Sequence, residues 1–484
     1  GNSIESGGNY NVVVGDEAGT AITTGDYNTA LGYQAGRAVT TGVRNALIGS
    51  GTGDALTTGD DNTAVGSFSL GADTLGNRST AIGHNALAVQ NFTSSTSVYN
   101  TAVGYAAGAA VTTGVQNTLI GGLSGDAITT GIGNVAVGYN ALTVHTTGNN
   151  NVAIGNVALE SNTTASDIVA VGVAALRLNT TGADNVAVGA YSLDANTTGA
   201  SNTAVGDNSL SANTTASNNT AVGKLALSAN TTGEASTALG SLALDANTTG
   251  GFNTALGVHA LGGNTTASYN TAVGWGSLKD NTTGASLTAV GYAALDKNTT
   301  GDSNAAIGES ALGANTTASN NTAVGTSALL ANTTGANNTA IGKDAMIANT
   351  EGTVNTSVGV DSLTANTTGA SNTAVGQAAL EANTTASFNT GIGRNALGGN
   401  TTGANNTATG YNSLLANTTG SENTAVGRLA LDANTTGADN VAIGNSALGA
   451  NTTASNNTAV GSAALLANTT GVDNNAFGQG ALAA

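Results

Sequence analysis

Few residues in this chain carry side chains suited to acid–base or metal chemistry, and they are scattered. The histidines are His84, His145 and His259, and the absence of cysteine rules out a thiolate nucleophile or a disulfide. Catalysis needs an acid, a base or a nucleophile converging on one point. Histidines this far apart do not converge, so we expect no catalytic residue, no cofactor and no enzyme activity.

The aspartates show a pattern, but it is not that of a ligand cluster. They recur at one position of the repeat described below without occupying consecutive repeats: Asp54, Asp126, Asp194, Asp245, Asp296 and Asp432. Calcium needs several oxygen ligands together, and a polysaccharide-cleaving enzyme needs clustered carboxylates. The sequence therefore predicts no metal site and argues against a carbohydrate-active enzyme.

The overall composition narrows the possible partners. The 484 residues include 70 Gly and no Pro, only 8% are charged, and the formal net charge is −18. Without a basic patch the chain has nothing to neutralise phosphates, so nucleic acid is not an expected partner. No run of 18 apolar residues occurs, so we expect no membrane insertion.

A strict repeat organises these residues. A glycine that closes words such as N-T-A-V-G recurs from Gly15 to Gly478 at intervals of 17 residues, with one interval of 21 between Gly83 and Gly104. Seventeen residues are too few for a helical-hairpin repeat, and each unit holds short strand-like words between turn residues. We therefore predict an all-β fold, a parallel β-solenoid or β-roll with 28 coils.

The apolar residues suggest how each coil packs. We number a unit from its anchor glycine as position 1; position 17 is then almost always Val, Ile or Leu, and position 16 is mostly Ala. Strand alternation puts these two on opposite faces, and we assign position 17 to the core and Ala204 and its equivalents to the outside. Position 5, mostly Leu, is assigned to the core as well. The predicted core residues are Val205, Leu210, Val222 and Leu227.

Positions 5 and 8 change together along the chain. From Gly155 onward they are Leu, or once Met, and Asn, whereas five earlier units combine Gly with an aliphatic residue. Exchange at constant volume indicates that both positions fill one interior space. This change divides the chain into residues 1–154, with mixed core types, and residues 155–484, with regular coils.

The word N-T-T at positions 8–10 has two interpretations. It matches an N-glycosylation acceptor, but a glycan on every coil would be crowded at a strand spacing of about 4.8 Å. Stacked amides can instead hydrogen-bond from coil to coil. We favour an asparagine ladder that includes Asn196, Asn213 and Asn230.

One expanded turn breaks the repeat. The four extra residues fall in Q-N-F-T-S-S-T-S-V-Y at 90–99. A loop that interrupts a fixed register is a candidate contact site, and the residues expected to make contact are Asn91, Phe92 and Tyr99. Tolerated drift of a surface loop is the alternative explanation.

The anchor words resemble those of a known family. N-V-A-I-G at 151–155, N-V-A-V-G at 185–189 and N-V-A-I-G at 440–444 resemble the YadA-like head repeats of trimeric autotransporter adhesins and of related phage and bacterial fibre proteins. The resemblance implies a left-handed β-roll, a homotrimeric rod and a role in attachment. It also implies an extracellular location, on a bacterial cell surface or a virion. A period of 17 residues is longer than is typical of these heads.

The thin core also favours self-association. Each coil offers about two large side chains, worth very roughly 4 kcal/mol, against an ordering cost on the order of 25 kcal/mol for 17 residues. We expect a structural and adhesive fibre whose partners are further copies, fibre segments at both ends, and a host-surface glycan or protein. Two alternatives stay open: an ice-binding or other surface-binding solenoid that uses the threonines at positions 9 and 10, and a filament subunit joined end to end.

Overall fold

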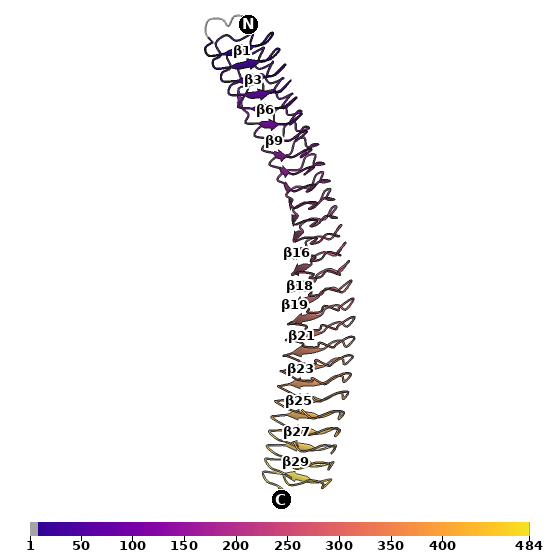
Figure 1. The fold of residues 1–484 in the computed structure, drawn as a ribbon. Coiled ribbons are helices and arrows are strands. Elements are labelled where there is room, and N and C mark those ends of the chain that lie inside the picture. The colour runs from indigo at the N-terminus through magenta and orange to yellow at the C-terminus, as the bar shows by residue number, and fades with distance from the viewer. Residues whose placement is uncertain (1–7, 484) are drawn as a thin grey trace. The chain divides into compact units, whose positions relative to one another are not determined.

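The computed structural model describes residues 8–483, and these form a parallel β-solenoid of about 27 turns with a 17-residue repeat and no helix. The described coils fall into two compact units, up to Ser241 (unit 1) and from Leu242 (unit 2). In each unit the short strands follow one another along a single stack (Figure 1). The change of core type at residue 155 lies inside unit 1.

Unit 1 holds the first sixteen strands. They are β1 (Val12–Val14), β2 (Thr29–Leu31), β3 (Ala46–Ile48), β4 (Thr63–Val65), β5 (Gly76–Asn77), β6 (Thr80–Ile82), β7 (Thr96–Ser97), β8 (Thr101–Val103), β9 (Thr118–Ile120), β10 (Val135–Val137), β11 (Val152–Ile154), β12 (Val169–Val171), β13 (Val186–Val188), β14 (Thr203–Val205), β15 (Thr220–Val222) and β16 (Thr237–Leu239). From β1 to β16 each strand pairs in parallel with the strand of the adjacent coil within the unit, except that β5 and β7 form a separate pair.

Unit 2 repeats the same arrangement without interruption. Its strands are β17 (Thr254–Leu256), β18 (Thr271–Val273), β19 (Thr288–Val290), β20 (Ala305–Ile307), β21 (Thr322–Val324), β22 (Thr339–Ile341), β23 (Thr356–Val358), β24 (Thr373–Val375), β25 (Thr390–Ile392), β26 (Thr407–Thr409), β27 (Thr424–Val426), β28 (Val441–Ile443), β29 (Thr458–Val460) and β30 (Asn475–Phe477). Each strand pairs with the next in exact 17-residue register.

The anchor glycine is required because adjacent coils approach closely there. Gly206 has φ 134°, a region that L side chains rarely adopt. A Cβ on Gly206 would lie only 2.6 Å from the carbonyl oxygen of Gly223 in the next coil. The Gly206 amide meanwhile donates to the carbonyl of Val188 in the preceding coil at 2.8 Å. Position 1 therefore requires glycine for two reasons: the positive φ angle and the close approach of the next coil's backbone.

The assignment of the two strand faces is wrong in the sequence analysis. Ala204 is fully buried, and Val205 and Val222 are partly exposed on the outer face. Leu210 and Leu227 are fully buried, as expected. The alternation was read correctly but its phase was inverted, because the bulky leucine at position 5 fills the thin interior and leaves room only for a methyl group opposite it.

Side-chain size is coupled across three positions. A Cβ added to Gly53, at position 5, would lie 2.8 Å from Cδ2 of Leu47, at position 16. A Cβ on Gly125 would lie 2.8 Å both from Leu119, again at position 16, and from Ile128, at position 8. Positions 5 and 8 therefore share one interior space as the sequence indicates, and position 16 belongs to that space as well.

Each coil bends through residues in the left-handed conformation. In the coil that begins at Gly206 these are Asn208, Leu210 and Asn218, with φ of 55°, 50° and 63°. A branched side chain in this region is uncommon and costs conformational energy. The five units with glycine at position 5, such as Gly53 at φ 55°, avoid that cost but lose the buried leucine.

Two columns of buried asparagine form hydrogen bonds from coil to coil inside the solenoid. At position 8, Asn213 donates from Nδ2 to Oδ1 of Asn196 at 2.9 Å, and Asn230 donates likewise to Asn213 at 3.0 Å. At position 14, Asn219 donates to the Gly233 carbonyl of the next coil at 2.9 Å. The N-T-T asparagines are thus a buried hydrogen-bonded ladder in the folded protein.

Candidate functional site

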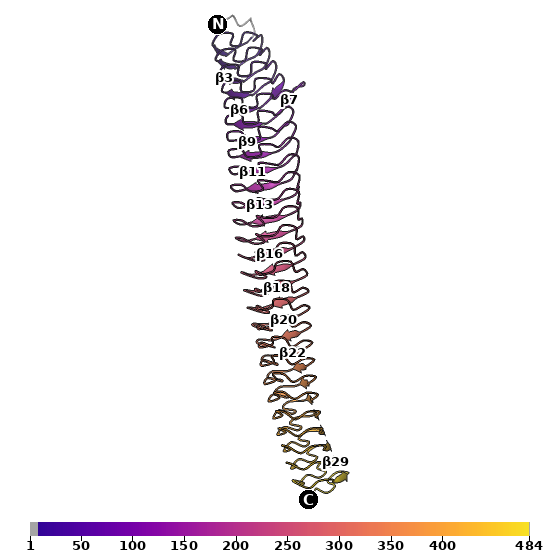
Figure 2. The ribbon, with the colours of Figure 1, turned by 90° about the vertical axis from the view of Figure 1, so that its right-hand side faces the viewer.

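The expanded turn at 90–99 carries strand β7, which projects beside the stacked coils of unit 1 (Figure 2). Its strand β7 pairs in parallel with β5 of the preceding coil, with Gly76 opposite Thr96 and Asn77 opposite Ser97. Asn77 Nδ2 also donates to Ser95 Oγ at 3.0 Å. Thr96 and Ser97 of the expanded turn are therefore held in a small second sheet.

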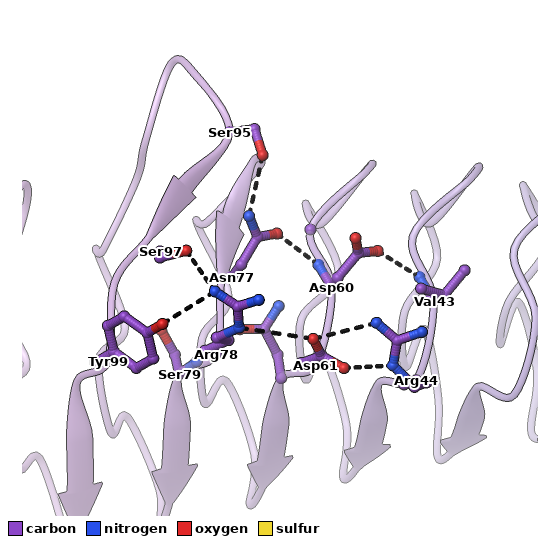
Figure 3. Close-up of polar contacts among 12 residues, drawn as sticks. Val43, Arg44, Asp60, Asp61, Asn77, Arg78, Ser79, Ser95, Ser97 and Tyr99 are labelled. Carbon is purple, nitrogen blue, oxygen red and sulfur yellow. Dashed lines mark hydrogen bonds and ion pairs between the residues drawn. The ribbon is translucent and has the colours of Figure 1, made fainter.

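A row of charged and aromatic side chains runs beneath this turn (Figure 3). Asp61 accepts hydrogen bonds from Arg44, at 2.5 and 3.2 Å, and lies 3.8 Å from Nε of Arg78. Arg78 Nη1 then donates to Ser97 Oγ at 2.6 Å and to the Tyr99 hydroxyl at 3.0 Å, and its guanidinium lies 5.6 Å from the centre of the Tyr99 ring. The hydrogen bond from Arg44 lowers the pKa of Asp61 below its usual range. This exposed row orients Tyr99 and Ser97.

A buried polar network anchors the same turn from inside. Gln90 donates to Asp73 Oδ2 at 2.7 Å and to Ser79 at 2.9 Å, and accepts from Asn100 at 2.8 Å. Asp73 also accepts from the Gly76 amide at 3.0 Å. Burial raises the pKa of Asp73, although these hydrogen bonds oppose the shift. Asp73 and Gln90 occupy position 8, where later coils have asparagine.

The predicted contact residues of the turn do not share one role. Phe92 is buried, 7% exposed, so the expectation that it makes contact is wrong; the ring fills the space beneath the turn. Asn91 is exposed and accepts a hydrogen bond from the Thr74 hydroxyl at 3.0 Å, and Tyr99 is 51% exposed. The exposed tip consists of hydroxyl-bearing residues at 93–97. The turn thus presents Asn91, Tyr99 and a hydroxyl-rich tip on a fixed base.

A second candidate surface is the outer face of the stacked strands, which we name the ribbon and define as positions 15 and 17 of every coil. In unit 1 it combines Thr, Val or once Ala at position 15 with an aliphatic residue at position 17, and Leu239 is 45% exposed. In unit 2 position 15 is mostly Thr, and Leu256 and Ile341 are 42% and 40% exposed. No ribbon residue is charged.

Stacked aromatic pairs lie beside the ribbon in unit 2. Phe252 and Tyr269, both at position 13, stack with ring centres 5.2 Å apart, and Trp275 and Tyr292, both at position 2, stack at 5.1 Å. The first pair precedes strands β17 and β18, and the second follows β18 and β19. Aromatic rings therefore extend the exposed apolar surface beyond both ends of β18.

The histidines take three unrelated environments. His84 stacks on Tyr105 at 5.6 Å, and His259 lies at position 3 of a coil in unit 2. His145 is buried at position 8, where Nε2 is 2.8 Å from the Gly148 carbonyl oxygen and Nδ1 accepts from Asn162 at 3.0 Å. Burial lowers the pKa of His145. This neutral imidazole makes the hydrogen bonds that asparagine makes elsewhere at position 8.

The acidic residues at position 6 do not form a cluster. Burial raises the pKa values of Asp126, Asp245, Asp296 and Asp432. Among residues 8–483 no group of three or more His, Cys, Asp or Glu is placed to hold a metal ion. Some position-6 carboxylates pair with a basic residue instead, as Asp194 does with Arg177 of the preceding coil at 3.0 Å and Asp296 does with Lys297 at 3.6 Å.

The sequence analysis missed the ribbon, the Asp73 network and the role of Arg78. One signal for the ribbon existed: Leu47 and Leu119 at position 16 each lie between two units with glycine at position 5. That coincidence shows that position 16 points inward, and position 17 then points outward. The contacts of Arg78 and Asp73 had no comparable signal, because they depend on how the extra residues fold back.

No family model matches the chain, and no curated protein matches it. Within the described part of the chain, no helix is long and apolar enough to span a bilayer.

Proposed function

We propose that this protein is the shaft of an extracellular structural and adhesive fibre, built from copies that associate side by side through their ribbons. The observation that carries the proposal is the uncharged, half-exposed aliphatic row at position 17, repeated in register on successive strands. Contiguous apolar surface of this extent is rare on soluble monomers and marks interaction sites. A left-handed homotrimeric β-roll, as the sequence resemblance implies, would cover three ribbons at once.

The composition supports the same proposal. A regular coil buries one leucine, a few alanine or serine residues and usually two asparagines, so it has little apolar core of its own. Small cores need further burial to offset the entropy of ordering. Covering the ribbon supplies that burial. The expanded turn at 90–99 is then the place where we expect contact with a host-surface glycan or protein.

A ribbon variant tests the proposal directly. Ile341→Asp puts a charge on the exposed face of β22, where it can be solvated in a monomer but not in an assembly. We expect the parent to have a multiple of the chain mass by light scattering, three times for a trimer, and the variant to dissociate with its β-sheet circular dichroism retained. Thr334→Glu is the matched control, since Thr334 is exposed at position 10 and another coil carries Glu351 there. A parent of single-chain mass would contradict the proposal.

Ice binding is a second candidate, favoured by a different property of the same surface. The ribbon presents threonine hydroxyl and methyl groups in register on a parallel sheet, without charge. The two threonines at positions 9 and 10, which the sequence analysis considered for this array, differ in exposure. Thr214 Oγ1 at position 9 donates to the carbonyl of Thr231 in the next coil at 3.1 Å, whereas Thr215 at position 10 is exposed. Thermal hysteresis by a monomeric protein would favour this function over the fibre.

A further inference from the structure

Self-association of a regular solenoid raises a problem of axial register. Each coil of unit 2 presents nearly the same pair of ribbon residues as the next, because strands pair in exact 17-residue register. Two copies shifted by one coil, about 4.8 Å along the stack, would therefore bury almost the same surface. A specific residue must therefore favour one axial alignment over the others, because flat, repetitive strand pairings otherwise shift in register. The inference below rests on the proposed self-association.

Position 17 of unit 2 contains a single hydroxyl. It is aliphatic from Leu256 to Val460 except at Thr409 in β26, and β30 ends the row with Phe477. Strand β26 pairs with both neighbours in the normal register, so Thr409 lies directly between Ile392 and Val426 in that row. Its side chain is partly exposed, and among the described residues its hydroxyl makes no hydrogen bond. Threonine has therefore replaced an aliphatic residue without any gain inside its own chain.

The residues at position 15 do not distinguish one axial alignment from the next. It is threonine in most strands of unit 2, so a shift by one coil generally sets threonine against threonine again. A polar group confined to one level of an apolar row is different, because its partner exists at one alignment only. Buried polar residues fix the register of coiled coils in this way, at some cost in stability.

We infer that Thr409 determines the axial register in which copies of this chain associate. In a parallel assembly with rotational symmetry, a residue near the axis meets its own counterpart. At the correct alignment the Thr409 hydroxyls meet, and each can donate to one neighbour and accept from another. After a shift by one coil each hydroxyl faces Ile392 or Val426 and is buried without a partner, which is unfavourable.

Because the 484-residue sequence contains no cysteine, introduced cysteines can report the axial register. Cysteine is introduced at position 15 of β23 or β24, as Thr356→Cys or Thr373→Cys, away from Thr409. Each protein is assembled alone or mixed with the other, and thiols are joined with a short cross-linker. Same-level cross-links report the aligned assembly, and cross-links between the two different variants report a shift by one coil.

We expect same-level cross-links to dominate in the parent. In a Thr409→Val background the shifted cross-links should rise about tenfold, as an unpaired buried hydroxyl costs at least that much in an equilibrium, while the mass of the assembly stays the same. Thr409→Ser keeps the hydroxyl and should retain the parent ratio. An assembled protein whose ratio is unchanged by Thr409→Val would overturn this inference alone. A parent that stays monomeric would overturn the proposed self-association instead.

Discussion

At the scale of single residues, the coil is specified by a few interior positions whose side-chain sizes are coupled to one another. Position 5 holds a fully buried leucine despite a left-handed backbone, as at Leu210 with φ 50°. The burial must outweigh the conformational cost, since the five coils with glycine there recover the volume through Leu47, Ile128 and similar residues. Leucine at position 5 is thus the main apolar contribution of each regular coil.

Truncating a core residue should lower stability far more than truncating a ribbon residue. Leu210→Ala leaves a cavity beside Ala204 and should lower the free energy of unfolding by about 2–5 kcal/mol. Val205→Ala removes only a partly exposed side chain and should cost less than about 1 kcal/mol in a monomer. Denaturant titration of both variants under monomeric conditions compares them. A larger loss for Val205→Ala would mean that the strand faces are the other way round.

His145 makes the stability of unit 1 sensitive to acid. Its pKa lies below its usual range because burial disfavours the imidazolium. The unfolded chain then binds a proton more readily than the folded one, so this contribution to stability is present above about pH 6.5 and lost as the pH falls below it. We expect the denaturation midpoint to drop between pH 7.5 and pH 5.

His145→Asn isolates that contribution. Asparagine is the usual residue at position 8, and it can donate to the Gly148 carbonyl and accept from Asn162 without titrating. The variant should lose most of the decrease seen in the parent between pH 7.5 and pH 5. Asp73 provides no such decrease, because a raised carboxyl pKa favours the folded state at low pH. Equal pH dependence in parent and variant would assign the effect to other groups.

At the scale of elements, the strands are three residues long, or two in β5 and β7, and they are stabilised by pairing with the adjacent coils. Each pairs with its neighbours, as β14 does with β13 and β15, and the turns repeat the pattern through side-chain and backbone hydrogen bonds 17 residues apart. The expanded turn is also held by pairing between coils, because Thr96 and Ser97 in β7 pair with β5. At position 8 of these two coils, Asp73 and Gln90 take the place of asparagine. An insertion is accepted where its polar groups can be satisfied.

Anchor glycines should be irreplaceable, whereas a glycine with open surroundings should not. In unit 2, a Cβ at Gly291 would lie 2.5 Å from the Gly308 carbonyl oxygen. Gly291→Ala should therefore lower the unfolding free energy by at least about 1–3 kcal/mol. Gly276→Ala, in the preceding coil, meets nothing within 4 Å and adopts a conformation that Ala293 already has. Thermal melts of both variants should separate them clearly.

At the scale of the whole molecule, both units have the same two features: a narrow interior of leucine, alanine and asparagine, and an apolar outer row. In solenoids each repeat touches only its neighbours, so stability is close to a sum over coils and interfaces. A core this thin favours covering the ribbon, and the variants at Ile341 and Thr409 address whether and at what level copies do so. The formal charge of −18 resides off the ribbon and keeps the remaining surface soluble.

The sequence alone determined the period, the parallel solenoid, the shared space of positions 5 and 8 and the asparagine ladder at position 8. Each of these repeats along the chain, so a regular spacing or a paired exchange reveals it. Only the tertiary structure decided which strand face is buried, because alternation in a three-residue strand fixes that Ala204 and Val205 point apart but not which points inward. The tertiary structure also decided that Phe92 is buried and which residues Arg78 contacts. An insertion that occurs once cannot be compared with other repeats, and its conformation depends on the local space and on the hydrogen bonds available to it.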